Sequence, residues 1–289
     1  MRNLTEQSIS DAVRERFAEC PDPRLNQLFD SLIRHLHEFA REVRLTPEEW
    51  MAGINFLTAA GHITNEKRQE FILLSDTLGL SALVDILQNG DKPEQITESS
   101  LLGPFFREGA PEMPFDADIA GPVEGKRVVL HGRVTSIYGQ PVADAMLDVW
   151  QAAPNGLYDL QDENQPEMNL RARFRTDSEG RYRFRSIKPA SYPVPTDGPV
   201  GQMLNAVGRH PFRPAHIHFL ITAPDYETLT TALYIDGDEY LDSDAVFGSR
   251  KSLVVGYSQL DQGNDRMSND RDSKIDSIKF DFVLNPKRK

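Results

Sequence analysis

Residues 213–219 of the chain are Arg213-Pro214-Ala215-His216-Ile217-His218-Phe219. The apolar and β-branched residues that follow favour a β-strand, and Pro214 stands where such a strand would begin. Side chains two residues apart on a strand share one face, so the imidazoles of His216 and His218 can bind a single metal ion. On spacing alone, the pair can equally be two half-buried strand residues.

A second pair of histidines has the same spacing in a different setting. His35 and His37 lie within residues 28–39, whose apolar positions recur at helical intervals. Two residues along a helix correspond to a turn of about 200°, so these two rings diverge. We therefore expect His35 and His37 to be surface or boundary residues of a helix.

Composition narrows the class of protein. A chain of 289 residues can bury a sizeable core. Its net charge of −12 argues against nucleic acid or an anionic membrane as the main partner. Cys20 is the only cysteine, which excludes an internal disulfide and any multi-cysteine metal site. No secretory signal and no apolar run of membrane-spanning length is present, so we expect a cytoplasmic protein.

The pattern changes from helical to strand-like along the chain. Helices are expected from a capping box at Thr46-Pro47-Glu48-Glu49 and over residues 66–77 and 81–89. Prolines then punctuate a connecting or wrapping segment that ends at Pro122. Short strands follow, with expected positions at residues 128–134, 146–150, 181–187 and 278–284. The sequence predicts an α+β protein, with a helical domain over residues 1–95 and a mainly antiparallel β-sandwich domain over residues 96–289.

Two histidines leave a metal site incomplete, and tyrosines are candidate oxygen ligands. Tyr158 and Tyr192 stand in loop-like segments that contain glycine or proline. Each can equally be an ordinary half-buried loop tyrosine. A carboxylate such as Asp225 is a competing ligand, which with the two histidines would form a ferrous or zinc site. A β-sandwich binding module without catalytic activity is a third possibility.

Three ordered segments resemble the intradiol ring-cleaving dioxygenases, namely residues 149–159, 192–201 and 208–218. The similarity extends over nearly the whole chain. It implies a mononuclear, non-haem Fe(III) ion bound by Tyr158, Tyr192, His216 and His218. Two phenolates and two neutral imidazoles leave one net positive charge on a ferric centre. Such a centre suits a doubly deprotonated catechol as the substrate.

The resemblance also implies catalytic roles for Tyr192 and Arg213. The Tyr192 phenolate can act as a base for a catecholic proton when substrate binds. Arg213 matches a family arginine that stabilises developing negative charge on the substrate, although a surface salt bridge is the alternative role. The implied reaction is intradiol cleavage of a catecholic ring by dioxygen, which yields a muconate-type diacid.

Two further segments bear on which ring is cleaved. Residues 73–79 and 239–248 resemble the hydroxyquinol-cleaving branch of the family more than the catechol-cleaving branch. Asp76 can accept a hydrogen bond from the third hydroxyl of hydroxyquinol (benzene-1,2,4-triol), or it can be a solvated helix residue. Ala232 replaces a glutamine that many catechol-cleaving relatives carry. We expect 3-hydroxy-cis,cis-muconate and its tautomer maleylacetate as product, with catechol cleavage to cis,cis-muconate as the alternative.

Resemblance also assigns the pocket and the partners. The expected substrate-binding residues are Leu73, Asp76, Leu101, Leu102, Gly103, Pro104, Phe105, Val194, Pro195, Arg213 and Val246. Ordinary core packing is the competing explanation for each apolar member. The family further implies a homodimer formed through the amino-terminal helices, where relatives can hold a phospholipid. Neither nucleic acid nor a membrane is expected as a partner.

Overall fold

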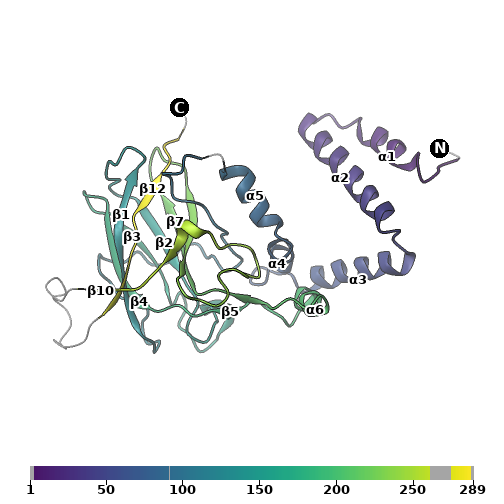
Figure 1. Ribbon diagram of the computed structural model, residues 1–289. Coiled ribbons are helices and arrows are strands. Elements are labelled where there is room, and N and C mark those ends of the chain that lie inside the picture. Colours follow the sequence, from purple (N-terminus) through teal and green to yellow (C-terminus); the bar gives the residue numbers. More distant parts are fainter. Residues whose placement is uncertain (1–2, 91, 261–274, 288–289) are drawn as a thin grey trace. The chain divides into compact units, whose positions relative to one another are not determined.

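The computed structural model describes residues 3–90, 92–260 and 275–287 (Figure 1). Backbone contacts divide the chain into two compact units, residues 1–59 and residues 60–289. The division falls inside helix α3 (Pro47–Ile63), so helices α4 (Glu70–Thr77) and α5 (Leu80–Asn89) belong to the second unit. The domain boundary at residue 95 groups these two helices differently, and it stays a prediction.

The first unit contains helices α1 (Ile9–Phe17) and α2 (Pro23–Glu42) and most of α3. The predicted capping box at the start of α3 is confirmed, because Thr46 and Glu49 each accept a hydrogen bond from the other's backbone N–H. His35 is exposed and His37 is half-buried, with their rings bonded to different neighbours, as the helical spacing predicts. This pair therefore forms no joint site.

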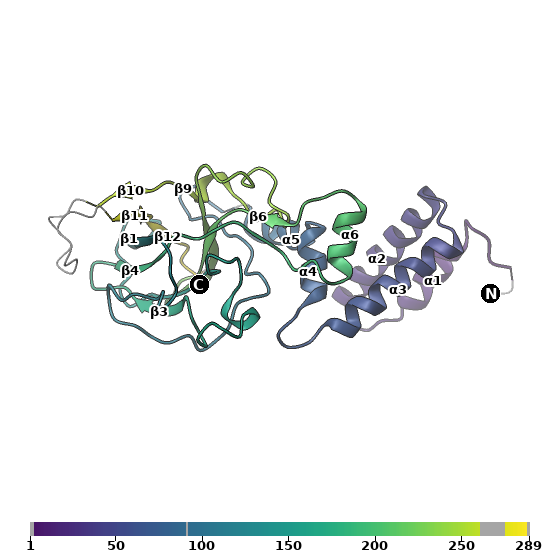
Figure 2. The same ribbon diagram turned by 90° about the horizontal axis from the view of Figure 1, so that it is seen from below.

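The second unit contains two five-stranded sheets, and Figure 2 shows them from a second side. One sheet is formed by β1 (Arg127–Ser136), β4 (Arg181–Ile187), β10 (Ser258–Gln259), β11 (Asp276–Lys279) and β12 (Phe282–Leu284). The other is formed by β2 (Met146–Trp150), β3 (Arg171–Arg175), β7 (His216–Thr222), β8 (Leu229–Ile235) and β9 (Val254–Val255). Most pairs are antiparallel, but β11 and β12 pair with β1 in parallel, as does β9 with β8.

One hydrophobic core joins the two sheets. Leu130 and Phe184 of the first sheet share it with Phe174 and Ile217 of the second. The rings of Phe174 and Phe184 stack with centroids 4.9 Å apart. The fold class is thereby confirmed as α+β with a mainly antiparallel sandwich.

The expected strand over residues 278–284 is interrupted, so this prediction is wrong in one detail. The chain crosses closely over Gly132, where a Cβ atom would lie only 1.8 Å from the carbonyl oxygen of Phe280. Asp281 leaves the ladder and accepts a hydrogen bond from the backbone N–H of Arg133 at 2.8 Å. The result is two short strands, β11 and β12.

The connecting segment before β1 wraps around the second unit, as predicted. Its backbone N–H groups donate to β8 and β3, from Ser100 to Thr230 and from Met113 to Arg173. It then reaches β4, where Ile119 donates to Arg185. On the way, the segment carries residues 101–105 past the outer face of β7. No helix among the described residues has the length and apolar character needed to cross a bilayer.

Candidate metal centre

The strand β7 places its histidines outside the sandwich core. Ile217 and Phe219 point into the core shared by the two sheets. His216 and His218 therefore face the opposite side, because successive side chains of a strand alternate. Their rings approach with centroids 4.6 Å apart and Nε2 atoms 3.0 Å apart. The two-residue spacing thus brings both imidazoles to one point, as predicted.

Two loops bring the tyrosines to the same point. Tyr158 precedes the short 3₁₀ turn η1 (Asp159–Gln161), whose Gln161 side chain accepts the Tyr158 backbone N–H at 3.0 Å. Tyr192 begins strand β5 (Tyr192–Pro193), which pairs with β6 (Phe212–Arg213). Gly156 permits the close approach, since its φ is 80° and a Cβ would lie 2.9 Å from Cβ of Tyr192.

Four polar side-chain atoms converge as a result. Tyr158 Oη lies 3.2 Å from Tyr192 Oη, which lies 3.5 Å from His216 Nε2. Ligands about 2.0–2.1 Å from one metal ion are separated by roughly 2.9–3.4 Å when the angles lie between square and tetrahedral values. The observed separations of 3.0, 3.2 and 3.5 Å lie in this range or within 0.1 Å of it, so the four atoms suit ligands of a single ion. His216 Nδ1 bonds the Pro214 carbonyl at 2.7 Å, which leaves Nε2 free to face a metal.

Burial sets the protonation of this cluster. It lowers the pKa of His216 to about 3, with a further effect from the Arg213 charge, and it lowers the pKa of His218 well below its ordinary value. The imidazoles are therefore neutral, as metal ligands must be. Burial also raises the pKa of both Tyr158 and Tyr192. Deprotonation of two such phenols at neutral pH requires a strong local cation, and a trivalent metal ion is one.

The carboxylate alternative does not form. Asp225 lies in a turn with a left-handed φ of 64°, and its backbone carbonyl accepts the N–H of Lys287. Among the described residues, no group of three or more His, Cys, Asp or Glu side chains is arranged to hold a metal ion. The site that the structure does assemble combines two tyrosines with two histidines.

Arg213 reaches the cluster from a buried position. Its side chain is 5% exposed, so it is not a surface salt bridge. Nη1 lies 3.1 Å from His216 Nε2, while Nε donates to Asp244 Oδ1 at 3.1 Å. Burial acts to raise the pKa of Asp244, but the Arg213 charge holds it below its ordinary value. The hydroxyl of Tyr234, 3.4 Å from Nη2, completes the surroundings of the guanidinium.

A cavity adjoins the cluster and contains ten of the eleven expected substrate-binding residues. The lining residues are Leu73, Asp76, Leu101, Gly103, Pro104, Phe105, Tyr192, Val194, Pro195, Arg213 and Val246. Leu102 is not among them, and this residue is 40% exposed. Neighbouring side chains of an extended segment point in opposite directions, so Leu101 enters the cavity and Leu102 turns away.

Asp76 is the acidic side chain of this cavity. It is only 4% exposed, so it is not a solvated helix residue. Burial raises its pKa, against the opposing effects of a hydrogen bond with Ser81 and of the Arg213 charge. A buried carboxyl group among mainly apolar lining residues is a strong candidate for recognising a polar group of a ligand.

The structure also gives Trp150, Ala232 and Asp244 positions around the site that the sequence did not predict. Trp150 lies opposite His218 in the sheet register, and their rings stack at 4.8 Å with an interplanar angle of 4°. Ala232 flanks His218 on the other side, fully buried, and adds no polar group to this face. Asp244 holds Arg213 and lies in a segment that the sequence singled out only for its resemblance. The one signal available in the sequence was the presence of an acidic residue within that segment.

Comparison with known proteins identifies the class. The family model described as "Catechol dioxygenase N terminus" matches residues 22–95, and the one described as "Dioxygenase" matches residues 102–286. The chain belongs to the intradiol ring-cleaving dioxygenases, a family of enzymes that use non-haem iron.

Within the family, the chain is similar to hydroxyquinol-cleaving members. It is 48% identical to 6-chlorohydroxyquinol 1,2-dioxygenase of Cupriavidus pinatubonensis, over 99% of each chain. It is 45% identical to hydroxyquinol 1,2-dioxygenase of Corynebacterium glutamicum, over 99% of this chain and 95% of the relative. A crystal structure of hydroxyquinol 1,2-dioxygenase from Pseudomonas putida DLL-E4 matches with a TM-score of 0.90 at 46% identity, covering 98% of this chain and 99% of that one. Catechol 1,2-dioxygenase of Pseudomonas arvilla C-1 matches at 30% identity with a TM-score of 0.84, covering 98% and 92%.

Proposed function

We propose that this chain binds Fe(III) through Tyr158, Tyr192, His216 and His218 and cleaves hydroxyquinol between its two adjacent hydroxylated carbons. Both atoms of dioxygen enter the product, so C₆H₆O₃ and O₂ give C₆H₆O₅, which is 3-hydroxy-cis,cis-muconate or its tautomer maleylacetate. The observation that carries the proposal is the convergence of two phenols and two imidazoles beside a cavity that contains Asp76. The similarity to hydroxyquinol-cleaving enzymes over nearly the full length supports it.

The residues divide the work of catalysis. A bound ferric ion supplies Lewis acidity that lowers the pKa values of two adjacent ring hydroxyls and activates the ring toward dioxygen. Tyr192 lines the cavity and is placed to take up a catecholic proton. Arg213 lines the cavity too and carries a permanent positive charge next to the proposed metal ligand His216, where it can stabilise negative charge on the ring. The apolar walls exclude water from the reacting ring.

Asp76 is proposed to recognise the third hydroxyl of hydroxyquinol. Catechol lacks this hydroxyl, so the buried carboxyl group would keep only its hydrogen bond with Ser81 and would leave an acceptor position unsatisfied. Such an unsatisfied group costs about 1–3 kcal/mol, which corresponds to roughly a 5- to 150-fold preference for hydroxyquinol. Catechol 1,2-dioxygenase activity is the alternative function, and it would require that Asp76 make no contact with the ring.

Steady-state oxygen uptake with both substrates tests the substrate. We expect the wild type to prefer hydroxyquinol and Asp76→Ala to lose most of that preference. Asp85→Asn is a matched control, because Asp85 lies on α5 and pairs with Arg250 away from the cavity. If the wild type prefers catechol, the chain is a catechol 1,2-dioxygenase instead. If Asp76→Ala loses both activities equally, Asp76 does not recognise the third hydroxyl.

The visible absorption spectrum tests the metal centre. Phenolate-to-ferric charge transfer should give the iron-loaded protein a reddish colour, and anaerobic addition of hydroxyquinol should shift the band. Tyr158→Phe should weaken the band and lower the iron content. Tyr182→Phe is the matched control, since Tyr182 is equally buried but donates to the Phe280 carbonyl within the sandwich. A colourless protein that contains stoichiometric iron would contradict tyrosinate ligation.

We also propose a homodimer formed through the amino-terminal helices. Along α2, an apolar stripe at helical spacing is 42–55% exposed, and it comprises Leu25, Leu28, Leu32, Leu36 and Phe39. Burial of such a stripe in a second copy would remove it from water. Light scattering tests the dimer, mass spectrometry of an organic extract tests a bound phospholipid, and cell fractionation tests the cytoplasmic location. A monomer in which the stripe stays exposed would contradict the assembly.

A further inference from the structure

Arg209 follows the carboxyl end of helix α6 (Pro199–Ala206). Gly208 takes a left-handed φ of 69°, and the backbone N–H groups of Gly208 and Arg209 donate to Asn205 and Leu204. This is a Schellman motif, which ends the helix and fixes the direction of the next side chain. The Arg209 side chain therefore leaves α6 from a defined position.

The guanidinium of Arg209 forms hydrogen bonds with two segments that carry lining residues of the substrate cavity, although it lies outside the cavity. Nη1 donates to the carbonyl of Thr77 at 2.6 Å, and Nη2 donates to the carbonyl of Ala245 at 2.9 Å. Each acceptor is one residue away from a cavity residue, Asp76 in the first case and Val246 in the second. Arg209 itself does not line that cavity.

The contact with Thr77 has a clear physical basis. Thr77 is the last residue of α4, so its carbonyl has no acceptor role within the helix. A cation at this end of a helix is favoured by the helix dipole. Thr77 and Ala245 are both fully buried, so their carbonyls depend on protein donors.

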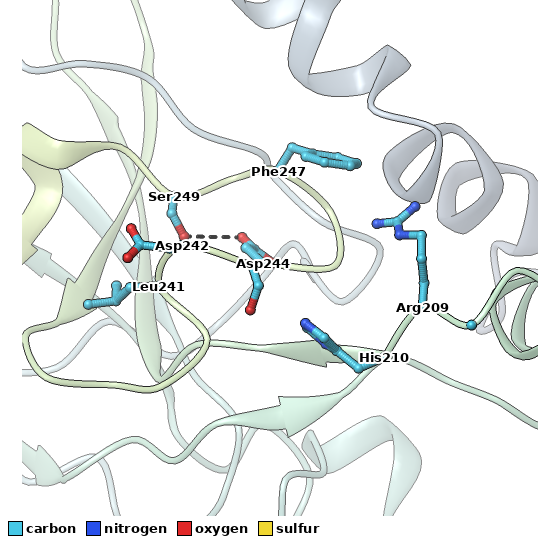
Figure 3. A pocket seen from close by; sticks show the side chains of 9 residues that line it. Arg209, His210, Leu241, Asp242, Asp244, Phe247 and Ser249 are labelled. Atoms are coloured by element: carbon cyan, nitrogen blue, oxygen red, sulfur yellow. Dashed lines mark hydrogen bonds between the residues drawn. The ribbon is translucent and has the colours of Figure 1, made fainter.

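Phe247 also contacts both Arg209 and the end of α4. Its ring lies 5.0 Å from the guanidinium carbon of Arg209, and it also lies against Gly79, just after α4. Phe247 adopts a left-handed φ of 59°, which is costly for an aromatic residue and must be maintained by its contacts. Figure 3 shows Phe247 and Arg209 on the same side of a surface hollow that also contains Asp244.

The other end of α6 is also joined to α4. The fully buried carboxylate of Glu70, at the start of α4, accepts the backbone N–H of Val200 at 3.0 Å. Hydrogen bonds near both ends of α6 therefore connect this helix to α4. The end with Arg209 also reaches the loop that carries Val246, through its hydrogen bond to the Ala245 carbonyl.

We propose that Arg209 is a positioning residue for ring specificity, because it sets the separation between Asp76 on α4 and Val246 on the facing loop. This inference rests on the proposed function of the site. A hydrogen bond between Asp76 and the third hydroxyl requires the ring to lie at a fixed distance from Asp76, and contact with Val246 on the facing loop would set that distance. Catechol, which has no third hydroxyl, does not use that separation, and its two hydroxyls are held at the metal centre that Arg209 does not touch.

The test is the ratio of kcat/KM for hydroxyquinol to kcat/KM for catechol in iron-loaded protein. Arg209→Met keeps the length of the side chain but donates no hydrogen bond, and we expect the ratio to fall at least tenfold, mainly through KM for hydroxyquinol. Arg209→Lys keeps the charge and should recover part of the ratio. Phe247→Leu should shift the ratio in the same direction without removing either hydrogen bond.

Arg173→Met is the matched control. Its Nε donates to the Ala110 carbonyl at 2.7 Å, so the substitution removes an arginine-to-carbonyl bond at β3 instead of at the cavity. We expect it to leave the ratio within twofold of wild type. An anaerobic titration gives a second readout, in which Arg209→Met should weaken hydroxyquinol binding at least tenfold while the visible band of the resting enzyme is unchanged.

Two outcomes would overturn the inference. One is an equal loss of both activities in Arg209→Met, and the other is a shift of the ratio in Arg173→Met as large as that in Arg209→Met. If Arg209→Met does not fold, Arg209→Lys and Phe247→Leu must shift the ratio, and an unchanged ratio in both refutes the proposal. Failure of the proposed function is seen separately, as a wild type that does not prefer hydroxyquinol.

Discussion

The substitution Asp244→Asn should destabilise the second unit strongly, although it removes only a charge. The Asp244 and Arg213 side chains are 2% and 5% exposed, so each is the other's main compensation for lost hydration. Removing one partner from a buried ion pair costs about 3–5 kcal/mol, because the remaining charge is left buried and unpaired.

The lower end of this range applies here. Asp244 also accepts the backbone N–H groups of Val246 and Gly248, at 3.2 and 3.0 Å, and the amide oxygen of asparagine can keep one of these bonds. We therefore expect a loss of about 3 kcal/mol in the free energy of unfolding. For a unit of this size, that loss lowers Tm by about 6–12 °C.

Thermal unfolding followed by circular dichroism measures the effect, with iron content determined for each variant. Glu112→Gln is the control, because Glu112 pairs with Arg175 at 2.8 Å while both side chains are about half exposed. An exposed pair contributes about 0–1 kcal/mol, so its loss should lower Tm by at most about 4 °C. If the two variants unfold within 2 °C of each other at roughly equal iron content, the assignment of Asp244 as the charge partner of Arg213 is wrong.

Three other predictions follow from local geometry. Burial raises the pKa of half-buried Asp148 to about 6, so the free energy of unfolding falls as pH rises from about 4 to about 6. In denaturant titrations, Asp148→Asn should therefore raise the free energy of unfolding by about 1 kcal/mol at pH 7.5 and leave it unchanged at pH 4. Gly156→Ala should lower iron per chain, because its Cβ meets Tyr192 at 2.9 Å in a left-handed backbone. Gly248→Ala should slow oxygen uptake with both substrates, since its Cβ lies 2.8 Å from Arg213 Nη2.

Local signals in the sequence were reliable where local contacts determine the structure. Strands β2 and β4 begin and end at the predicted residues, and the capping box of α3 forms as expected. The geometry of His216 and His218 also followed from spacing, because alternation along a strand needs no knowledge of the rest of the chain. The interruption between β11 and β12 did not, since it depends on a close crossing at Gly132.

Contacts between residues far apart in the chain could not be predicted from the sequence. Tyr158 and Tyr192 meet only because two separate loops fold over β7, and spacing along the chain carries no information on that approach. The pairing of Arg213 with Asp244, thirty-one residues later, is of the same kind. Family resemblance supplied the tyrosines in advance, but it did not supply Asp244 or Arg209, because resemblance to a motif says nothing of which carbonyl or carboxylate a side chain meets.

The strand β7 explains how the side chains of the candidate metal centre can be placed precisely without being part of the sandwich core. It pairs with β2 on one side and β8 on the other, so its register is fixed twice. A slip of one residue in the strand pairing would exchange the faces of Ile217 and His218, so that an imidazole would enter the core and an aliphatic side chain would lie at the candidate metal centre. Such a slip is unfavourable because apolar side chains would lose their burial in the core. The packing of Ile217 and Phe219 therefore holds the histidines in position from the opposite face, and a core substitution such as Ile217→Ala should loosen the metal site as well as the fold.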